Sequence, residues 1–176
     1  MDWLELKPSE IIAICAVIVS VISLVSVISL VVANKTLKAQ RTHNKLSLRP
    51  IVHISKGDYE DKIFVKVKNY GLGPLIIKSC EINKFGQQYD TLVESLGDKA
   101  SEIVWDTFAA NIDGRVLAPQ NEFILIEATF EDGFDDRIKK EIRRSLASTT
   151  ITVQYTCVYG ETYPEERERL SWFSRH

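Results

Sequence analysis

Residues 11–33 read IIAICAVIVSVISLVSVISLVVA, and this apolar stretch decides the architecture of the chain. Its 23 positions hold no charged residue, proline or glycine, and about 20 apolar residues suffice to cross a bilayer as a helix. A secretory signal would open with basic residues and hold a shorter apolar run. The ten residues before this stretch instead carry three acids against one base, Lys7. We therefore predict a transmembrane helix that is retained, not cleaved.

The flanking charges predict the orientation of this helix. Lys7 is the only base before the stretch, whereas five bases and no acid lie within residues 34–49. These bases are Lys35, Lys38, Arg41, Lys45 and Arg49. Because Lys and Arg next to a span stay on the cytoplasmic side, we expect the N-terminus outside and the remaining chain in the cytoplasm, at the inner membrane. Trp3 is either an anchor at the outer interface or part of a frayed tail.

The sequence then divides into three parts: residues 1–33 (outer tail and transmembrane helix), 34–48 (basic juxtamembrane stalk) and 49–176 (soluble domain). The five bases would contact anionic lipid, at roughly 1 kcal/mol per residue, or a polyanionic ligand such as an oligonucleotide gathered by several subunits. The net charge beyond Arg49 is −5. Net charge alone therefore gives no reason to expect nucleic-acid binding by the soluble domain.

The soluble domain has the pattern of β-strands. Apolar residues alternate with polar ones in residues 50–54 and 63–68, as in strands with one buried face. Residues 69–74, NYGLGP, form a tight bend, and residues 75–82 resume the pattern. Residues 123–130 are apolar on both faces. Counting these and the later segments predicts about six or seven strands, which favours an antiparallel sandwich.

Three other segments complete this expectation. Residues 135–148 carry an apolar stripe at four-residue intervals, with acids first and arginines last, which predicts a helix with a solvated basic face. Residues 151–159 alternate as a strand, and Gly160–Glu161 then predicts a two-residue hairpin returning through 162–173. Residues 89–111 show no clear periodicity. We expect short helices at 91–96 and 101–110, which would place Trp105 and Phe108 on one face.

No motif predicts catalysis, a cofactor or a metal. The three histidines, His43, His53 and His176, have no Cys or His at metal-ligand spacing. Motifs of hydrolases, metalloproteases and phosphate-binding loops are absent from the sequence. We therefore expect a protein that is not an enzyme. Cys80 and Cys157 would pair in an oxidising compartment, but a cytoplasmic domain predicts reduced thiols.

Three segments together resemble a known kind of protein: Leu48-Arg49-Pro50, Asn69 to Pro74, and residues 155–163, YTCVYGETY. They are similar to small bacterial proteins with one N-terminal membrane helix and an immunoglobulin-like sandwich. The resemblance implies an immunoglobulin-like antiparallel β-sandwich with one or two short connecting helices, and Tyr155 resembles the tyrosine corner of such domains. By architecture the chain also resembles membrane effectors of bacterial anti-phage systems, whose cytosolic β domain senses a nucleotide or a partner.

Small residues recur within the transmembrane stretch. Together with three alanines, the serines fill a stripe about 150° wide at roughly 3.5 residues per turn. These serines are Ser20, Ser23, Ser26 and Ser29. Such a stripe favours close packing of helices. Pore lining, and serines that bond only within their own helix, are the alternatives.

Two functions follow. In the first, a non-enzymatic effector or sensor forms a homo-oligomer through its membrane helix and perturbs or permeates the membrane, with the β domain sensing a nucleotide, an oligonucleotide or another cytoplasmic signal. In the second, the helix is only a tether, and the sandwich is an adaptor for a partner protein, such as one encoded nearby.

Overall fold

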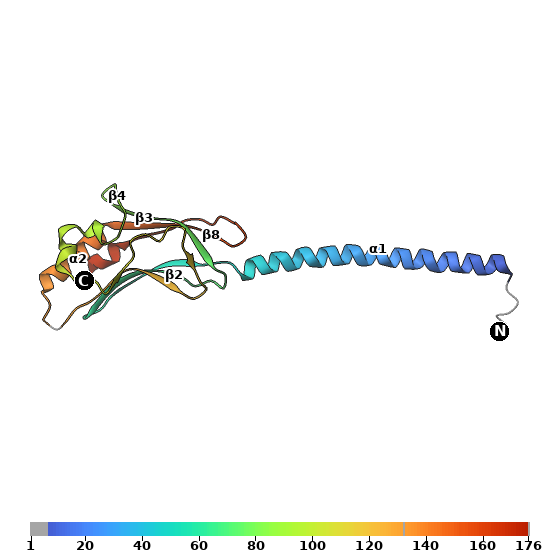
Figure 1. The fold of residues 1–176 in the computed structure, drawn as a ribbon, viewed down its shortest axis with the longest axis horizontal. Coiled ribbons are helices and arrows are strands. Elements are labelled where there is room, and N and C mark those ends of the chain that lie inside the picture. Colours follow the sequence, from blue (N-terminus) through green and yellow to red (C-terminus); the bar gives the residue numbers. More distant parts are fainter. Residues whose placement is uncertain (1–6, 132, 176) are drawn as a thin grey trace. The chain divides into compact units, whose positions relative to one another are not determined.

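The computed structural model describes residues 7–131 and 133–175, and the chain divides into two compact units between Leu46 and Ser47. The first unit is built on a single helix, α1 (Pro8–Ser47), which is unbroken through the apolar stretch and the stalk (Figure 1). At about 1.5 Å per residue, its 40 residues measure about 60 Å. α1 is therefore long and apolar enough to span a membrane. Trp3 lies outside the described residues.

The second unit is formed by two antiparallel sheets (Figure 1). The first has the strand order β1-β2-β7-β5 and the second β4-β3-β8-β9, with β6 also paired to β3. The strands are β1 (Val52–Asp58), β2 (Lys62–Asn69), β3 (Leu75–Lys84), β4 (Gln87–Tyr89), β5 (Thr107–Phe108), β6 (Val116–Leu117), β7 (Glu122–Thr129), β8 (Thr149–Cys157) and β9 (Glu166–Arg169). The predicted mainly β fold with one long N-terminal helix is confirmed. The described residues hold nine strands, because β4, β5 and β6 are too short to show a period in sequence.

Alternating residues of the two sheets make one core. Ile63, Val65 and Val67 of β2 are at most 2% exposed, and they pack in the same cluster as Ile77 of β3 and Val153 of β8. Burying one such side chain stabilises the fold by roughly 1.5–3 kcal/mol. The core therefore joins the sheets face to face, and it leaves the alternate residues of each strand on the outer faces.

The bend at residues 69–74 is held by a buried side chain. Asn69 is fully buried, and its Oδ1 accepts hydrogen bonds from the backbone N–H of Ile51 (3.2 Å) and Gly71 (2.9 Å). Its Nδ2 donates to the carbonyl of Gly73 at 2.8 Å. A Cβ on Gly73 would collide with the carbonyl of Leu48. The glycine is thus required because two stretches of backbone touch there.

Three helical segments gather at one end of the sandwich, where the middle one along the chain packs against the other two (Figure 1). They are η2 (Glu94–Glu102), α2 (Asp136–Ala147) and η3 (Leu170–Arg175). α2 is the helix predicted at 135–148. Asp135 caps it by accepting from the N–H of Arg137 (2.8 Å), and Ile142 and Leu146 are fully buried. Its apolar stripe therefore closes this end of the core.

Two local predictions were wrong. The short helix expected at 91–96 is a 3-10 segment, η2, kinked at Gly97, and residues 107–108 of the second expected helix form β5 instead. Trp105 packs against the core while Phe108 is 54% exposed, so they share no buried face. The reason is that β5 pairs with β7, and this tertiary pairing overrides a weak local preference.

The late hairpin also differs from the prediction. Its turn is wider than two residues, with a bridge between Thr156 and Thr162, and regular pairing with β8 resumes only at Glu166. Pro164 lacks the N–H that a ladder needs, which explains the interruption. Residues 170–175 then form η3 instead of a strand.

Candidate functional site

The serines of α1 bond within their own helix. Each hydroxyl donates to the carbonyl four residues earlier at 2.8 Å, so the acceptors are the carbonyls of Ala16, Val19, Ile22 and Val25. All four serines are exposed in the single chain, as are the large apolar residues around them. Each hydroxyl oxygen still carries lone pairs that can accept a hydrogen bond from another helix.

The serine face depends on how α1 is wound. At about 100° per residue in a straight α-helix, the arc from Ser20 to Ser29 covers about 180°. At about 3.5 residues per turn, which supercoiled helices adopt, the same arc narrows to about 150°. Ser20, Ser23 and Ser26 stay on one side of the helix in both cases. Val21 and Ile28 lie on the opposite side.

The structure brings four of the five predicted basic residues onto one helix. Lys35, Lys38, Arg41 and Lys45 extend α1 beyond its apolar stretch and fall within an arc of about 120°. Arg49 is separate, since it follows the end of α1 and lies 5.1 Å from the centroid of the Tyr163 ring. Tyr163 in turn stacks on Tyr155, the residue expected to form a tyrosine corner, with centroids 5.5 Å apart.

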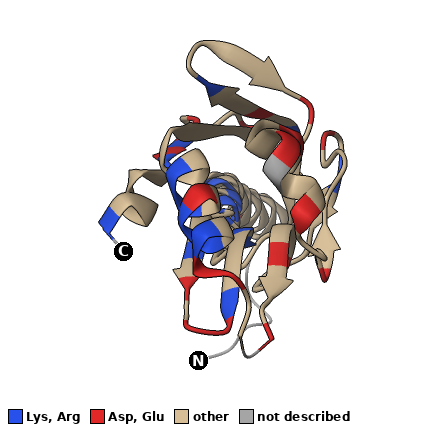
Figure 2. Cartoon of the chain, turned by 90° about the vertical axis from the view of Figure 1, so that its left-hand side faces the viewer, with Lys and Arg blue, Asp and Glu red and all other residues tan. Residues whose placement is uncertain are grey.

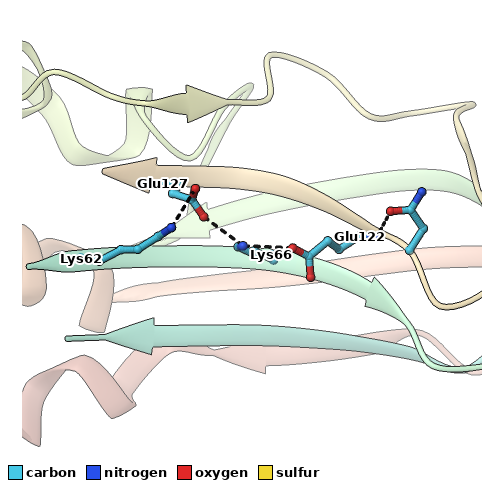
Figure 3. Close-up of polar contacts among 5 residues, drawn as sticks. Lys62, Lys66, Glu122 and Glu127 are labelled. Atoms are coloured by element: carbon cyan, nitrogen blue, oxygen red, sulfur yellow. Dashed lines mark hydrogen bonds and ion pairs between the residues drawn. The ribbon is translucent and has the colours of Figure 1, made fainter. Parts of the chain in front are cut away.

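An ion-pair cluster lies on the outer face of the β1-β2-β7-β5 sheet (Figure 3). The Nζ of Lys66 lies 3.0 Å from Oε1 of Glu122 and 2.9 Å from Oε2 of Glu127. The Nζ of Lys62 lies 3.0 Å from Oε1 of Glu127. Sequence reasoning missed this cluster, although Lys62, Lys66 and Lys68 share one face of β2 and are its visible signal.

Two pKa values report the strength of this cluster. The Lys66 ammonium, with help from Lys62, holds the pKa of Glu127 below its ordinary value, because these cationic contacts outweigh burial, which alone would raise that pKa. Burial alone would lower the pKa of Lys66, but its contacts with Glu127 and Glu122 raise it overall. Two lysines thus face two carboxylates, and the cluster stabilises the sheet without presenting free positive charge.

The basic face of α2, expected to be solvated, partly docks the helix. The guanidinium of Arg143 donates to both carboxylate oxygens of Asp58, at 2.8 and 2.9 Å. Lys139 donates to the carbonyl of Glu60 (3.1 Å) and lies 4.9 Å from the centroid of Phe130. In Figure 2, the basic turns of α2 accordingly lie beside an acidic turn. These contacts tie α2 to the β1–β2 turn.

Cys80 and Cys157 are free thiols on the neighbouring strands β3 and β8. Burial, reinforced by the carboxylates of Asp113 and Glu81, raises the pKa of Cys80 to about 12. Cys157 is 2% exposed. Neither thiol therefore has the exposed thiolate that a reactive cysteine needs.

Within residues 7–131 and 133–175, no group of three or more His, Cys, Asp or Glu side chains is placed to hold a metal ion. The polar clusters described above are ion pairs that join one strand or helix to another.

A comparison with protein families matches residues 11–174 to a domain of unknown function, DUF8453. The chain belongs to the DUF8453 family. The match starts at the first residue of the apolar stretch and runs into η3, so the DUF8453 domain includes both the helix and the sandwich. No curated protein matches the chain.

Proposed function

We propose that this protein is a non-enzymatic membrane effector that assembles through α1 and senses a cytoplasmic signal with its sandwich. One observation supports the proposal above others: a single unbroken helix carries both a 23-residue apolar stretch with four exposed hydroxyls and an arc of four bases. The family match adds support, since it includes this helix with the sandwich.

Assembly through α1 has a physical basis. Lipid gives apolar helices no hydrophobic reason to associate, so contact must come from close backbone approach and polar bonds. The serine side chains are small, so a neighbouring helix can approach this side of α1 closely, and the free lone pairs of the hydroxyls can accept hydrogen bonds across the interface. At about 0.6 kcal/mol per bond, four serines contribute a few kcal/mol per subunit. Identical parallel helices close most simply into a ring about the membrane normal.

The basic arc supports the orientation within this proposal. One base before the apolar stretch and five after it keep the sandwich in the cytoplasm, at the bacterial inner membrane. Lys35, Lys38, Arg41 and Lys45 then contact anionic headgroups, or a polyanion gathered by several subunits around the ring axis. A C-terminal alkaline phosphatase fusion that is active in the periplasm would contradict this orientation.

Disulfide cross-linking tests the assembly. Single cysteines at Ser20, Ser23 and Ser26, in a chain with Cys15 replaced by alanine, should give cross-linked dimers and higher species in native membranes. Val21→Cys and Ile28→Cys are depth-matched controls on the opposite side of the helix and should cross-link much less. Uniform cross-linking, or none, would refute assembly through the serine face and leave the helix as a tether for an adaptor domain.

The effector part of the proposal rests on the resemblance of the sequence to anti-phage membrane effectors. When the sandwich is engaged, the helix bundle perturbs or permeates the membrane. Overexpression in a bacterial host should then depolarise the membrane, as a potential-sensitive dye reports. The double variant Ser23→Leu and Ser26→Leu should abolish the leak at equal protein level, whereas the matched Val21→Leu and Ile28→Leu variant should not.

A further inference from the structure

A polar hollow lies on the outer face of the β4-β3-β8-β9 sheet. It has a volume of about 480 Å³ and spans β3, β8 and β9. Its lining includes Asn83, Phe85, Thr150, Thr152, Arg167 and Arg169. The register explains why these residues meet, since Asn83, Thr150 and Arg169 are paired across the three strands. The volume falls in the range of about 300–1,000 Å³ typical of small-molecule sites.

The two arginines supply uncompensated positive charge. Residues alternate along β9, so Arg167 and Arg169 are exposed on the hollow's side while Glu166 and Glu168 are partly buried on the other. Glu168 pairs with Lys56 of β1. Neither arginine forms an ion pair or side-chain hydrogen bond within the part of the chain that the structure describes. At two positions apart, they stand roughly 7 Å from each other, close enough to engage one phosphate or two adjacent ones.

Phe85 occupies an unusual turn at the opposite wall. It forms the two-residue β3–β4 turn with Gly86, and its φ of +52° lies in the left-handed region. That region disfavours a bulky residue, and asparagine is the usual choice there. Phe85 is nevertheless 87% exposed, so no core packing compensates for the strain. A strained backbone that presents an aromatic ring to solvent beside a hollow indicates a binding role.

We propose that this hollow binds a nucleotide, with the phosphate on Arg167 and Arg169 and the base stacked on Phe85. Strands lie about 5 Å apart, so β3 and β9 are separated by about 10 Å, a span that a nucleoside phosphate bridges. Asn83, Thr150 and Thr152 line the floor with hydroxyl and amide groups. The inference rests on the sensing role proposed above and names its ligand class, and its test is independent of helix assembly.

Direct binding to the full chain in detergent micelles tests the proposal. Isothermal titration uses the 5′-mono- and triphosphates of adenosine, guanosine, cytidine and uridine, and 3′,5′-cyclic dinucleotides. At least one should bind with a Kd below about 1 mM. Arg167→Ala or Arg169→Ala should weaken it about 10- to 100-fold, and Phe85→Ala about 5- to 100-fold. Arg137→Ala on α2, an exposed arginine away from the hollow, should leave the affinity unchanged.

One further variant and one further ligand distinguish nucleotide binding from an effect on folding and from non-specific binding of anions. Phe85→Asn relieves the strained turn, so it should raise Tm while it weakens nucleotide binding. Tripolyphosphate, which has no base, should bind more weakly than the triphosphate and be insensitive to Phe85→Ala. The proposal is overturned if no nucleotide binds, if the arginine variants bind normally, or if tripolyphosphate binds as well as the best nucleotide. Each result stands whether or not the serine cysteines cross-link.

Discussion

Replacing Asn69 with alanine should destabilise the sandwich by about 4 kcal/mol. The substitution removes the hydrogen bonds of a fully buried side chain: two backbone N–H groups lose their acceptor, and one carbonyl loses its closest donor. Each buried group left without a partner costs about 1–3 kcal/mol. We take a value near the lower end, because water can enter the space that the smaller side chain leaves. Whole domains are stable by only about 5–15 kcal/mol.

Thermal unfolding of the full chain in detergent, followed by near-ultraviolet circular dichroism, measures this loss. For a sandwich of this size, about 4 kcal/mol corresponds to a fall in Tm of roughly 10–20 °C. Gln88→Ala is the matched control, because Gln88 is exposed on β4 and should change stability by less than about 0.5 kcal/mol. Asn69→Asp keeps the acceptor but buries a charge, so its stability relative to the natural chain should improve as pH falls. A loss below about 1.5 kcal/mol for Asn69→Ala would refute the reasoning.

Three further predictions concern other contacts. Glu127→Gln should lower the free energy of unfolding at pH 7 but much less near pH 3. The reason is that a carboxylate with a depressed pKa stabilises the fold above its unfolded pKa of about 4.5 and loses that effect as pH falls through its folded pKa. Urea unfolding at both pH values checks this, and an equal loss at both would contradict it. Gly73→Ala should cost about 3 kcal/mol, since its methyl group meets backbone; a Tm within about 2 °C of the natural chain would show that the bend relaxes freely. Cys80 should resist maleimide at pH 7 in the folded protein and react after denaturation, as mass spectrometry of tryptic peptides can show; rapid native labelling would mean that the thiol is accessible.

Periodic segments were predictable from the sequence, whereas the irregular ones were not. β2 has one face buried in the core, so its apolar residues recur with a period of two, and the apolar residues of β8 that point into the same core do likewise. α2 shows its stripe for the same reason at a helical period. Residues 89–111 and the return to β9 lack such a period. Their paths are set by pairing with β7, by Pro164 and by the kink at Gly97, and these effects act through the tertiary structure or through single residues.

The residues of the candidate site were likewise only partly predictable from the sequence. The serines and basic residues of α1 could be found because one helix carries them in sequence order. Arg49 could not be separated from them, since its contact with Tyr163 depends on how the sandwich folds. Phe85 and Arg169 are more than 80 positions apart and meet only through the register of β3, β8 and β9. The one local signal was a bulky Phe-Gly pair where a tight turn prefers Asn-Gly.

The hydrogen bonds inside α1 bear on how such a protein would be regulated in a cell. Because each of the four serines in the apolar stretch already donates its proton within its own helix, a solitary chain leaves none of these donors unsatisfied in lipid and suffers no penalty for remaining alone. In the proposed assembly, association would then follow two-dimensional mass action, and the surface density of chains would set the fraction assembled. In that case the rate of gene expression would control the fraction assembled, and a modest rise in copy number would lower the amount of signal needed for a response.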